Sequence, residues 1–253
     1  VDLHFTGIEQ VIGGNKDDTF RLVEGSNFTG NLDGGAGDNV LTYSAFNTAV
    51  QVKITSIEEN GSFVGTATGL NGSFTNIGLI VGSGAEEDSF TGADLDAVFE
   101  IGKDDRYRIG GVTISFAGFE KLIGGNLADT FNLVGTRNYH LDGGAGDDVF
   151  NFGADANLTG NIDGGTGDDT FDFAPGAHLF GSLQGGDGND TIVLGDADNI
   201  SGTLDGGTGT DRLKYSNFGT GVTVDLAQGS ATGVANGAPG SVTGIENITG
   251  SPY

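Results

Sequence analysis

Four short segments of the sequence combine glycine and aspartate in a pattern that suits the binding of a divalent cation. Each reads Gly-Gly-x-Gly-x-Asp-x-U, where U is large and apolar: GGAGDDVF (143–150), GGTGDDTF (164–171), GGDGNDTI (185–192) and GGTGTDRL (206–213). Calcium prefers about six to eight oxygen ligands, and glycine lets the backbone turn with positive φ so that its carbonyl groups face an ion. The pattern therefore predicts turns that supply carboxylate and carbonyl oxygens to Ca²⁺.

The candidate ligands occupy equivalent positions of these turns and of three related turns that begin at Gly13, Gly34 and Gly124. Those at the sixth position are Asp18, Asn39, Asp129, Asp148, Asp169, Asp190 and Asp211; those at the fifth are Asp38, Asp147, Asp168 and Asn189; and Asp187 stands at the third. A competing interpretation is that the sixth residue caps the turn by accepting backbone N–H groups, as in an Asx turn. Both interpretations remain open at this stage.

The spacing of the turns predicts the fold. Gly-Gly pairs begin at 143, 164, 185 and 206, so the repeat is 21 residues long, and an earlier pair of turns, at 13 and 34, has the same spacing. Between the turns, apolar and polar residues alternate, which indicates strands, and the glycine pairs would break any helix. We expect an all-β fold: a parallel β-solenoid of the β-helix or β-roll kind with about 21 residues per coil.

Superposing the repeats places apolar residues in four columns that we expect to form the core. These columns are Phe150, Phe171, Ile192 and Leu213; Phe152, Phe173, Leu194 and Tyr215; Leu158, Leu179 and Ile200; and Ile162, Leu183 and Leu204. Coils about 4.8 Å apart would also stack like acids, at a cost of about 0.9 kcal/mol per neighbouring pair in water. A shared divalent cation would reverse the sign of that energy.

A longer duplication predicts two modules. The segment LTYSAFNTAVQVKI (41–54) matches LKYSNFGTGVTVDL (213–226), each followed by TATG or SATG, and GIENITGS (244–251) echoes GIEQVIGG (7–14) and GFEKLIGG (118–125). We predict one solenoid module over 1–90, a connecting coil over 91–111, and a second module over 112–253 with three extra coils, in one continuous rod.

Composition restricts the partners. The chain has 35 acids against 10 Lys and Arg, a formal net charge of −25, so phosphate repulsion disfavours nucleic acids and anionic membranes. No apolar run approaches the roughly 20 residues of a membrane span. Cysteine is absent, which excludes disulfides and thiolate metal sites. Cations are the expected partners.

Three segments, FAGFEKLIGGNLADTFNL (116–133), GNIDGGTGDDTFDF (160–173) and LKYSNFGTGVTVDLAQGSATG (213–233), carry a family resemblance. They resemble the repeat modules of large secreted bacterial adhesin and haemagglutinin-like proteins with RTX-type, or haemolysin-type, calcium-binding turns. The resemblance implies a secreted or cell-surface location, bound Ca²⁺, and a role in adhesion, matrix or fibre formation. The chain departs from RTX toxins because each 21-residue unit carries the turn only once.

The sequence points to a structural protein and not to an enzyme. We expect a stalk or self-associating filament that can join head to tail and bind a cell-surface or polysaccharide ligand. The alternative is a carbohydrate-active module, lyase-like, epimerase-like or polysaccharide-targeting, in which Arg106, Tyr107 and Arg108 bind an acidic sugar and abstract a proton. We favour the simpler interpretation, a solvated patch of ion pairs.

Overall fold

The computed structural model describes residues 7–196 and 199–252, and almost all of their regular structure is β-strand. In these residues the one helical element is a single 3₁₀ turn, η1 (Ala235–Gly237). Most strands pair in parallel, so the predicted all-β class with parallel sheets is confirmed. The chain divides into two compact units, unit 1 (1–93 and 106–120) and unit 2 (94–105 and 121–253). In each unit we call the two main sheets the first and the second sheet.

Unit 1 combines parallel and antiparallel pairing. Its first sheet has the strand order β1 (Gln10–Ile12), β3 (Asn31–Asp33), β7 (Phe74–Thr75), β6 (Phe63–Ala67), β5 (Gln51–Ile57) and β9 (Ser89–Thr91). Its second sheet has the order β2 (Thr19–Val23), β4 (Val40–Ala45), β8 (Leu79–Val81), β12 (Val112–Ala117) and β11 (Arg106–Ile109). The pairs β5–β6, β6–β7 and β11–β12 are antiparallel.

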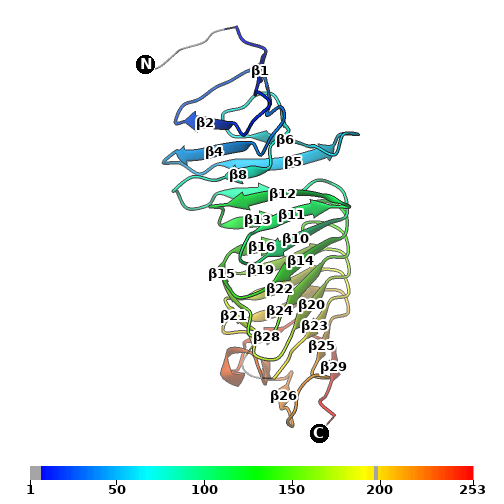
Figure 1. The fold of residues 1–253 in the computed structure, drawn as a ribbon. Coiled ribbons are helices and arrows are strands. Elements are labelled where there is room, and N and C mark those ends of the chain that lie inside the picture. The colour runs from blue at the N-terminus through cyan, green and yellow to red at the C-terminus, as the bar shows by residue number, and fades with distance from the viewer. Residues whose placement is uncertain (1–6, 197–198, 253) are drawn as a thin grey trace. The chain divides into compact units, whose positions relative to one another are not determined.

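Unit 2 is the regular part of the chain, and both of its main sheets are parallel (Figure 1). The first sheet contains β13 (Lys121–Ile123), β16 (His140–Asp142), β19 (Ile162–Thr166), β22 (Leu183–Asp187), β24 (Leu204–Thr208) and β28 (Val242–Thr243). The second contains β10 (Ala97–Ile101), β14 (Asp129–Leu133), β17 (Val149–Phe152), β20 (Thr170–Phe173), β23 (Thr191–Val193), β25 (Arg212–Lys214) and β29 (Asn247–Thr249). A third sheet contains β15 (Thr136–Asn138), β18 (Asn157–Thr159) and β21 (His178–Phe180), and a hairpin joins β26 (Val224–Asp225) to β27 (Ser230–Ala231).

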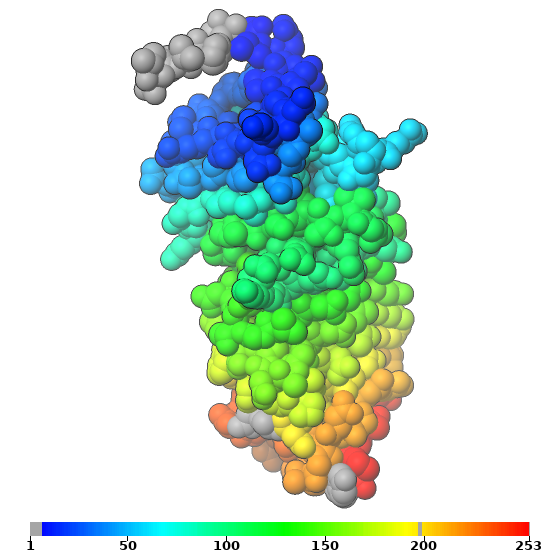
Figure 2. Space-filling view, viewed as in Figure 1, coloured from blue at the N-terminus to red at the C-terminus, as the bar shows by residue number. Residues whose placement is uncertain are grey.

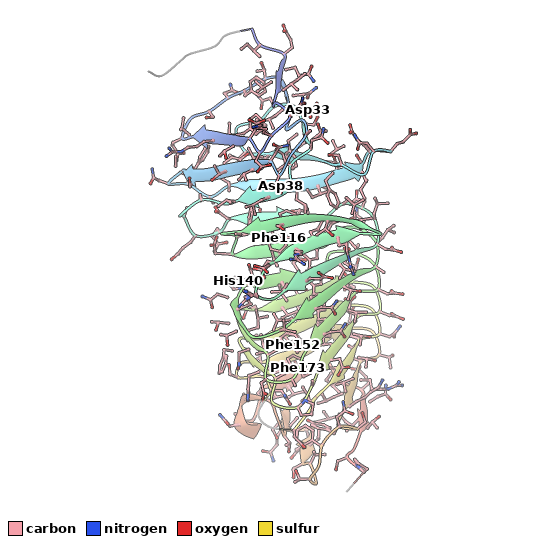
Figure 3. The ribbon with its side chains drawn as sticks, in the orientation of Figure 1. Asp33, Asp38, Phe116, His140, Phe152 and Phe173 are labelled. Carbon is pink, nitrogen blue, oxygen red and sulfur yellow. The ribbon has the colours of Figure 1, made fainter. Side chains whose placement is uncertain are left out.

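The pairing register of unit 2 confirms the four predicted apolar columns. Phe150 is the partner of Phe171, which is in turn the partner of Ile192, and every member of the four columns is at most 2 % exposed. The rings of Phe152 and Phe173 lie one over the other with centroids 4.3 Å apart (Figure 3). Figure 2 shows the outer surface of this part of the chain, coloured along the sequence. Stacked aromatic rings and aliphatic side chains therefore form a continuous core.

The long sequence duplication is also a structural duplication. Tyr43 packs edge-on against Phe46 with centroids 5.2 Å apart, and Tyr215 packs in the same way against Phe218 at 5.1 Å. An antiparallel hairpin follows each pair, with Val52 opposite Ala67 in one copy and Val224 opposite Ala231 in the other. The hairpins interrupt the parallel pattern, and a 21-residue repeat alone did not predict them.

Glycines at the turns let the backbones of adjacent repeats come close together. Gly165 has φ +100°, which disfavours other residues, and a Cβ on Gly164 would collide with the carbonyl oxygen of Gly185 in the next repeat. We expect Gly164→Ala to lower the free energy of unfolding by about 1–3 kcal/mol, because the backbone must move apart. Urea unfolding would measure the loss, with Gly221→Ala as the control, since a methyl group there meets no atom within 4 Å. Equal stability of the two variants would contradict the close approach.

In the part of the chain that the structure describes, no helix is both long and apolar enough to span a membrane.

Candidate functional site

The sixth-position aspartates of unit 2 form a buried column. Asp129, Asp148, Asp169, Asp190 and Asp211 are each at most 1 % exposed. The cause is strand alternation: each aspartate lies two residues before an inward-facing apolar residue, as Asp148 does before Phe150, and residues i and i+2 share a face. The residue type predicts a surface position, but the position in the strand places it inside.

Backbone N–H groups satisfy one oxygen of each carboxylate. The N–H of Asp148 donates to Oδ1 of Asp169 at 2.7 Å, and the N–H of Asp169 donates to Oδ1 of Asp190 at 2.8 Å. The same contact joins Asp129 to Asp148 and Asp190 to Asp211, and the last N–H, that of Asp211, donates to Oε2 of Glu246. A ladder of amide-to-carboxylate bonds therefore links the repeats. Its donors lie in the neighbouring repeat, whereas the cap within the same turn is seen at Asp18 and Asp129, whose Oδ2 atoms accept the N–H groups of Gly14 and Gly125.

The second carboxylate oxygen, Oδ2, lacks a hydrogen-bond partner in four of these aspartates. Oδ2 of Asp148, Asp169, Asp190 and Asp211 is buried and has no hydrogen-bond partner. A Cβ on Gly164 would meet both the Oδ2 of Asp169 and the carbonyl oxygen of Gly185, so these two oxygens share one small space. Two acceptors side by side without a donor between them repel, and an unpaired buried carboxylate oxygen is costly. A proton or a cation would relieve the conflict.

Burial raises the pKa values of these carboxyl groups. The pKa of Asp148 rises to about 8 and that of Asp169 to about 7, in each case mainly by desolvation. Burial likewise raises the pKa of Asp129 and of Asp190 to about 6, and it raises that of Asp211. Neighbouring aspartates add to the effect, because a second negative charge disfavours ionisation.

The corresponding residues of unit 1 are fully or largely paired. Asn39 is buried, its Oδ1 accepts the N–H of Asp18 at 2.9 Å, and its amide nitrogen donates to the carbonyl oxygen of Asn76 at 3.0 Å. Oδ2 of Asp18 accepts the N–H of Gly14 at 2.6 Å. Asn39 thus makes the same kind of bond to a neighbouring backbone N–H, but it carries a donor where the aspartates of unit 2 carry an unpaired oxygen.

The fifth-position residues form a second, exposed ladder that runs the other way. The N–H of Asp168 donates to Oδ1 of Asp147 at 2.9 Å, and that of Asn189 donates to Oδ1 of Asp168 at 2.7 Å. Asp38 donates in the same way to Asp17 in unit 1. Asp187 lies on the outer face of β22 and accepts the hydroxyl of Thr208. The predicted ligands therefore fall into a sixth-position set, buried except for the half-buried Asp18, and an exposed remainder.

Backbone carbonyls are the additional oxygens that a cation would find near the sixth-position column. Within the described residues, no three His, Cys, Asp or Glu side chains come together in a way that could hold a metal. A carboxylate oxygen beside main-chain carbonyl oxygens is nonetheless the hard, all-oxygen donor set that Ca²⁺ prefers. The unpaired Oδ2 atoms fit that ion.

The sequence interpretation missed the residues that end the ladders. Glu246 accepts the N–H of Asp211, and in unit 1 Glu120 accepts the N–H of Asp88 at 2.9 Å. Each glutamate follows a glycine and an apolar residue, in Gly-Phe-Glu (118–120) and Gly-Ile-Glu (244–246). That shared tripeptide was visible in the sequence, and its place directly before a strand was the available signal.

The structure places one residue of the carbohydrate-active alternative, Tyr107, where it cannot contact a sugar. Tyr107 is fully buried, its hydroxyl accepts the N–H of Ala93 at 2.7 Å, and its ring packs against Phe63 and Phe90. The expectation that Tyr107 lies in a solvated patch is wrong, because alternation along β11 turns it into the core. It cannot abstract a proton from a bound sugar.

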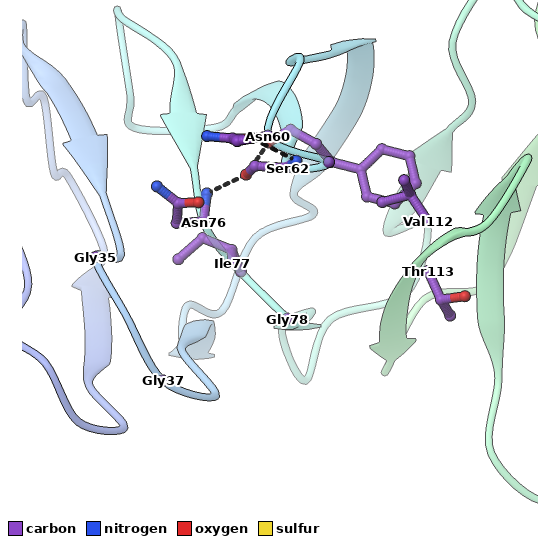
Figure 4. Close-up of a pocket in the computed structure, with 11 residues that line it drawn as sticks. Gly35, Gly37, Asn60, Ser62, Asn76, Ile77, Gly78, Val112 and Thr113 are labelled. Carbon is purple, nitrogen blue, oxygen red and sulfur yellow. Dashed lines mark hydrogen bonds between the residues drawn. The ribbon is translucent and has the colours of Figure 1, made fainter.

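The described surface has a hollow in each unit that could hold a small ligand. A polar cleft of about 200 Å³ in unit 1 contains Asn60, Ser62 and Asn76, and the N–H of Asn76 donates to Oγ of Ser62 at 2.6 Å (Figure 4). A shallow groove of about 520 Å³ crosses β19, β22 and β24 of unit 2. Its floor includes Gly165, Gly186 and Gly207, and its polar lining is Asp163, Thr166, Gln184, Asp187, Asp205 and Thr208. Neither hollow contains a sixth-position aspartate.

No protein-family model matches the chain, and no curated protein is similar enough to match it.

Proposed function

We propose that this chain is a secreted structural or adhesive β-solenoid segment that calcium stabilises at its glycine–aspartate turns. It serves as a stalk or self-associating filament outside the cell, with head-to-tail contacts between copies and a cell-surface or polysaccharide ligand. The repeats of unit 2 form the solenoid, with about one coil per 21 residues. The resemblance of the repeats and the net charge of −25 support this location and these partners.

One observation carries the proposal: four consecutive repeats each bury a carboxylate oxygen that no donor reaches. A buried anion without a partner is among the most unfavourable groups in a protein, so a site that repeats it four times requires a compensating charge. Asp148, Asp169, Asp190 and Asp211 would hold the ions, together with carbonyl oxygens of the adjacent turns. The bound Ca²⁺ supplies positive charge and no chemistry.

Calcium titration of the chelator-treated protein tests the proposal. Calorimetry should detect more than one Ca²⁺ per chain, and thermal unfolding should shift upward, since one site at a hundredfold excess over its Kd adds about 2.7 kcal/mol. Mg²⁺ is the matched control, because it demands octahedral geometry and dehydrates reluctantly, so it should stabilise less.

Electron microscopy of the same samples would report on shape and assembly. We expect elongated particles that join end to end with calcium and separate in chelator. Identical melting and identical particles in calcium and in EGTA would contradict the calcium part of the proposal, and compact particles would contradict the solenoid.

A further inference from the structure

The sixth-position residues are of two kinds, according to whether a buried side-chain oxygen lacks a hydrogen-bond partner. Asp148, Asp169, Asp190 and Asp211, all in unit 2, keep an unpaired buried oxygen. Asn39 in unit 1 and Asp129 at the start of the unit 2 column have partners for both side-chain polar atoms. Asp88 in unit 1 is outside the Gly-Gly turns, but it lies directly before β9 and two residues before the buried Phe90, which is an equivalent place, and both of its oxygens are also paired.

Asn39 shows which group can take the place of a cation at the sixth position of a turn. A Cβ on Gly34 would meet both Nδ2 of Asn39 and the carbonyl oxygen of Asn76, just as one on Gly164 would meet Oδ2 of Asp169 and the carbonyl oxygen of Gly185. In both turns, therefore, a side-chain atom of the sixth-position residue and a carbonyl oxygen of an adjacent segment lie beside the first glycine. At Asn39 a donor faces the carbonyl and makes a 3.0 Å hydrogen bond, whereas at Asp169 an acceptor faces it.

Asp88 is also fully paired, but by donors to both of its carboxylate oxygens. Its Oδ1 accepts the N–H of Val50 and the hydroxyl of Ser83, both at 2.8 Å, and its Oδ2 accepts the N–H of Ser83. Three donors therefore pair both oxygens of this carboxylate without a metal. Asp129 is similarly paired, because Ala97 donates to Oδ1 and Gly125 donates to Oδ2.

We propose that the calcium requirement is confined to the turns of unit 2 that hold Asp148, Asp169, Asp190 and Asp211, and that unit 1 keeps its structure without calcium. This inference rests on the proposed calcium function, and it adds that calcium regulates the stability of unit 2 alone. The ion concentration controls the order of one unit, while the other is held by amide and hydroxyl donors. Asn39 and the fully paired Asp88 make the first unit independent of calcium.

Hydrogen exchange of the whole chain, with CaCl₂ or with EGTA, tests the inference. Peptides that cover 143–215 should exchange at least about tenfold faster in EGTA, since the unfolding free energy there falls. Peptides that cover 33–67 should change less than about twofold. If both regions respond alike, the inference is overturned while the calcium proposal survives. If neither responds, the calcium proposal fails, and the inference with it.

Two matched substitutions give opposite expected results. Asp169→Asn supplies a donor to the Gly185 carbonyl, so in EGTA it should raise the melting temperature and slow exchange around 164–171, with a smaller calcium response. Asp129→Asn removes an acceptor from a paired carboxylate, so it should lower the melting temperature equally with and without calcium. A destabilised Asp169→Asn protein, or the same response from both variants, would overturn the inference.

Asn39→Asp supplies an independent check. The substitution gives unit 1 the unpaired oxygen that unit 2 has, so peptides over 33–67 should become calcium-sensitive by about tenfold in exchange rate. Continued insensitivity of a folded Asn39→Asp protein would mean that the unpaired oxygen does not create the requirement, and the inference would fall.

Discussion

In EGTA, the protein is expected to become less stable as the pH rises from 5 to 8. The pKa of Asp148 is raised to about 8, that of Asp169 to about 7 and that of Asp190 to about 6, in each case chiefly by burial. In the unfolded chain an aspartate has a pKa of about 3.9. Between these values the folded protein binds more protons than the unfolded chain.

The sign follows from proton linkage. When the native state holds the extra protons, stability falls as pH rises, and the loss continues until the pH passes the folded-state pKa. Each pH unit costs about 1.4 kcal/mol per proton, so we expect the melting temperature to fall by at least about 15 °C between pH 5 and pH 8. Calcium should stabilise more at pH 8 than at pH 5, because protons occupy Oδ2 at the lower pH.

Scanning calorimetry at pH 5, 6, 7 and 8, with EGTA or with CaCl₂, would measure both effects. The control is the Asp148→Asn, Asp169→Asn double variant, which lacks the two most strongly shifted groups and should lose most of the pH dependence. A melting temperature that rises with pH in EGTA would show that the aspartates are ionised and already paired in the folded state.

Removing a ring from the aromatic stack should have the largest effect of any single substitution. Phe171 is fully buried, and its ring lies over that of Phe150 with centroids 4.9 Å apart and planes 8° apart. We expect Phe171→Ala to lower the free energy of unfolding by about 3–5 kcal/mol, because the cavity lies between two repeats that cannot close over it.

Phe180→Ala is the matched control for this stack. Phe180 lies in the same unit but is 51 % exposed, so its loss should change stability by no more than about 0.5 kcal/mol. Urea unfolding at fixed calcium would compare the two. A small loss at Phe171 would mean that the repeats do not share one continuous core.

The sequence predicts the regular part of the fold well. In unit 2, alternation and a constant period identify the buried columns from Phe150 to Leu213 residue by residue, because each repeat must bury the same face against the next. Period alone could not place the echo at 244–251. Its strand, β29, belongs to the second sheet of unit 2, whereas the matching strand β1 belongs to the first sheet of unit 1. Pairing partners, which decide the sheet, lie far away in the sequence.

The candidate site was predictable only in part. The pattern identifies which aspartates recur, but not that one oxygen of each accepts an amide while the other is unpaired, since that depends on atoms of the next repeat. Asn39 illustrates the limit: in the sequence it looks like a conservative substitution of an aspartate, and in the structure it donates where the aspartates cannot. Tyr107 is a second example. In the sequence it stands among charged residues and is expected at the surface, but in the structure the alternation of its strand places it in the core.

A crystal structure of the protein grown in calcium at pH 8 would test the central claim most directly, the claim that a cation neutralises the buried Oδ2 atoms. The account predicts metal density about 2.3–2.6 Å from the Oδ2 atoms of the four aspartates that would hold the ions, with carbonyl oxygens of the turns completing the coordination. Absence of metal density at these atoms, with Oδ2 of Asp169 hydrogen-bonded to the carbonyl oxygen of Gly185, would contradict it.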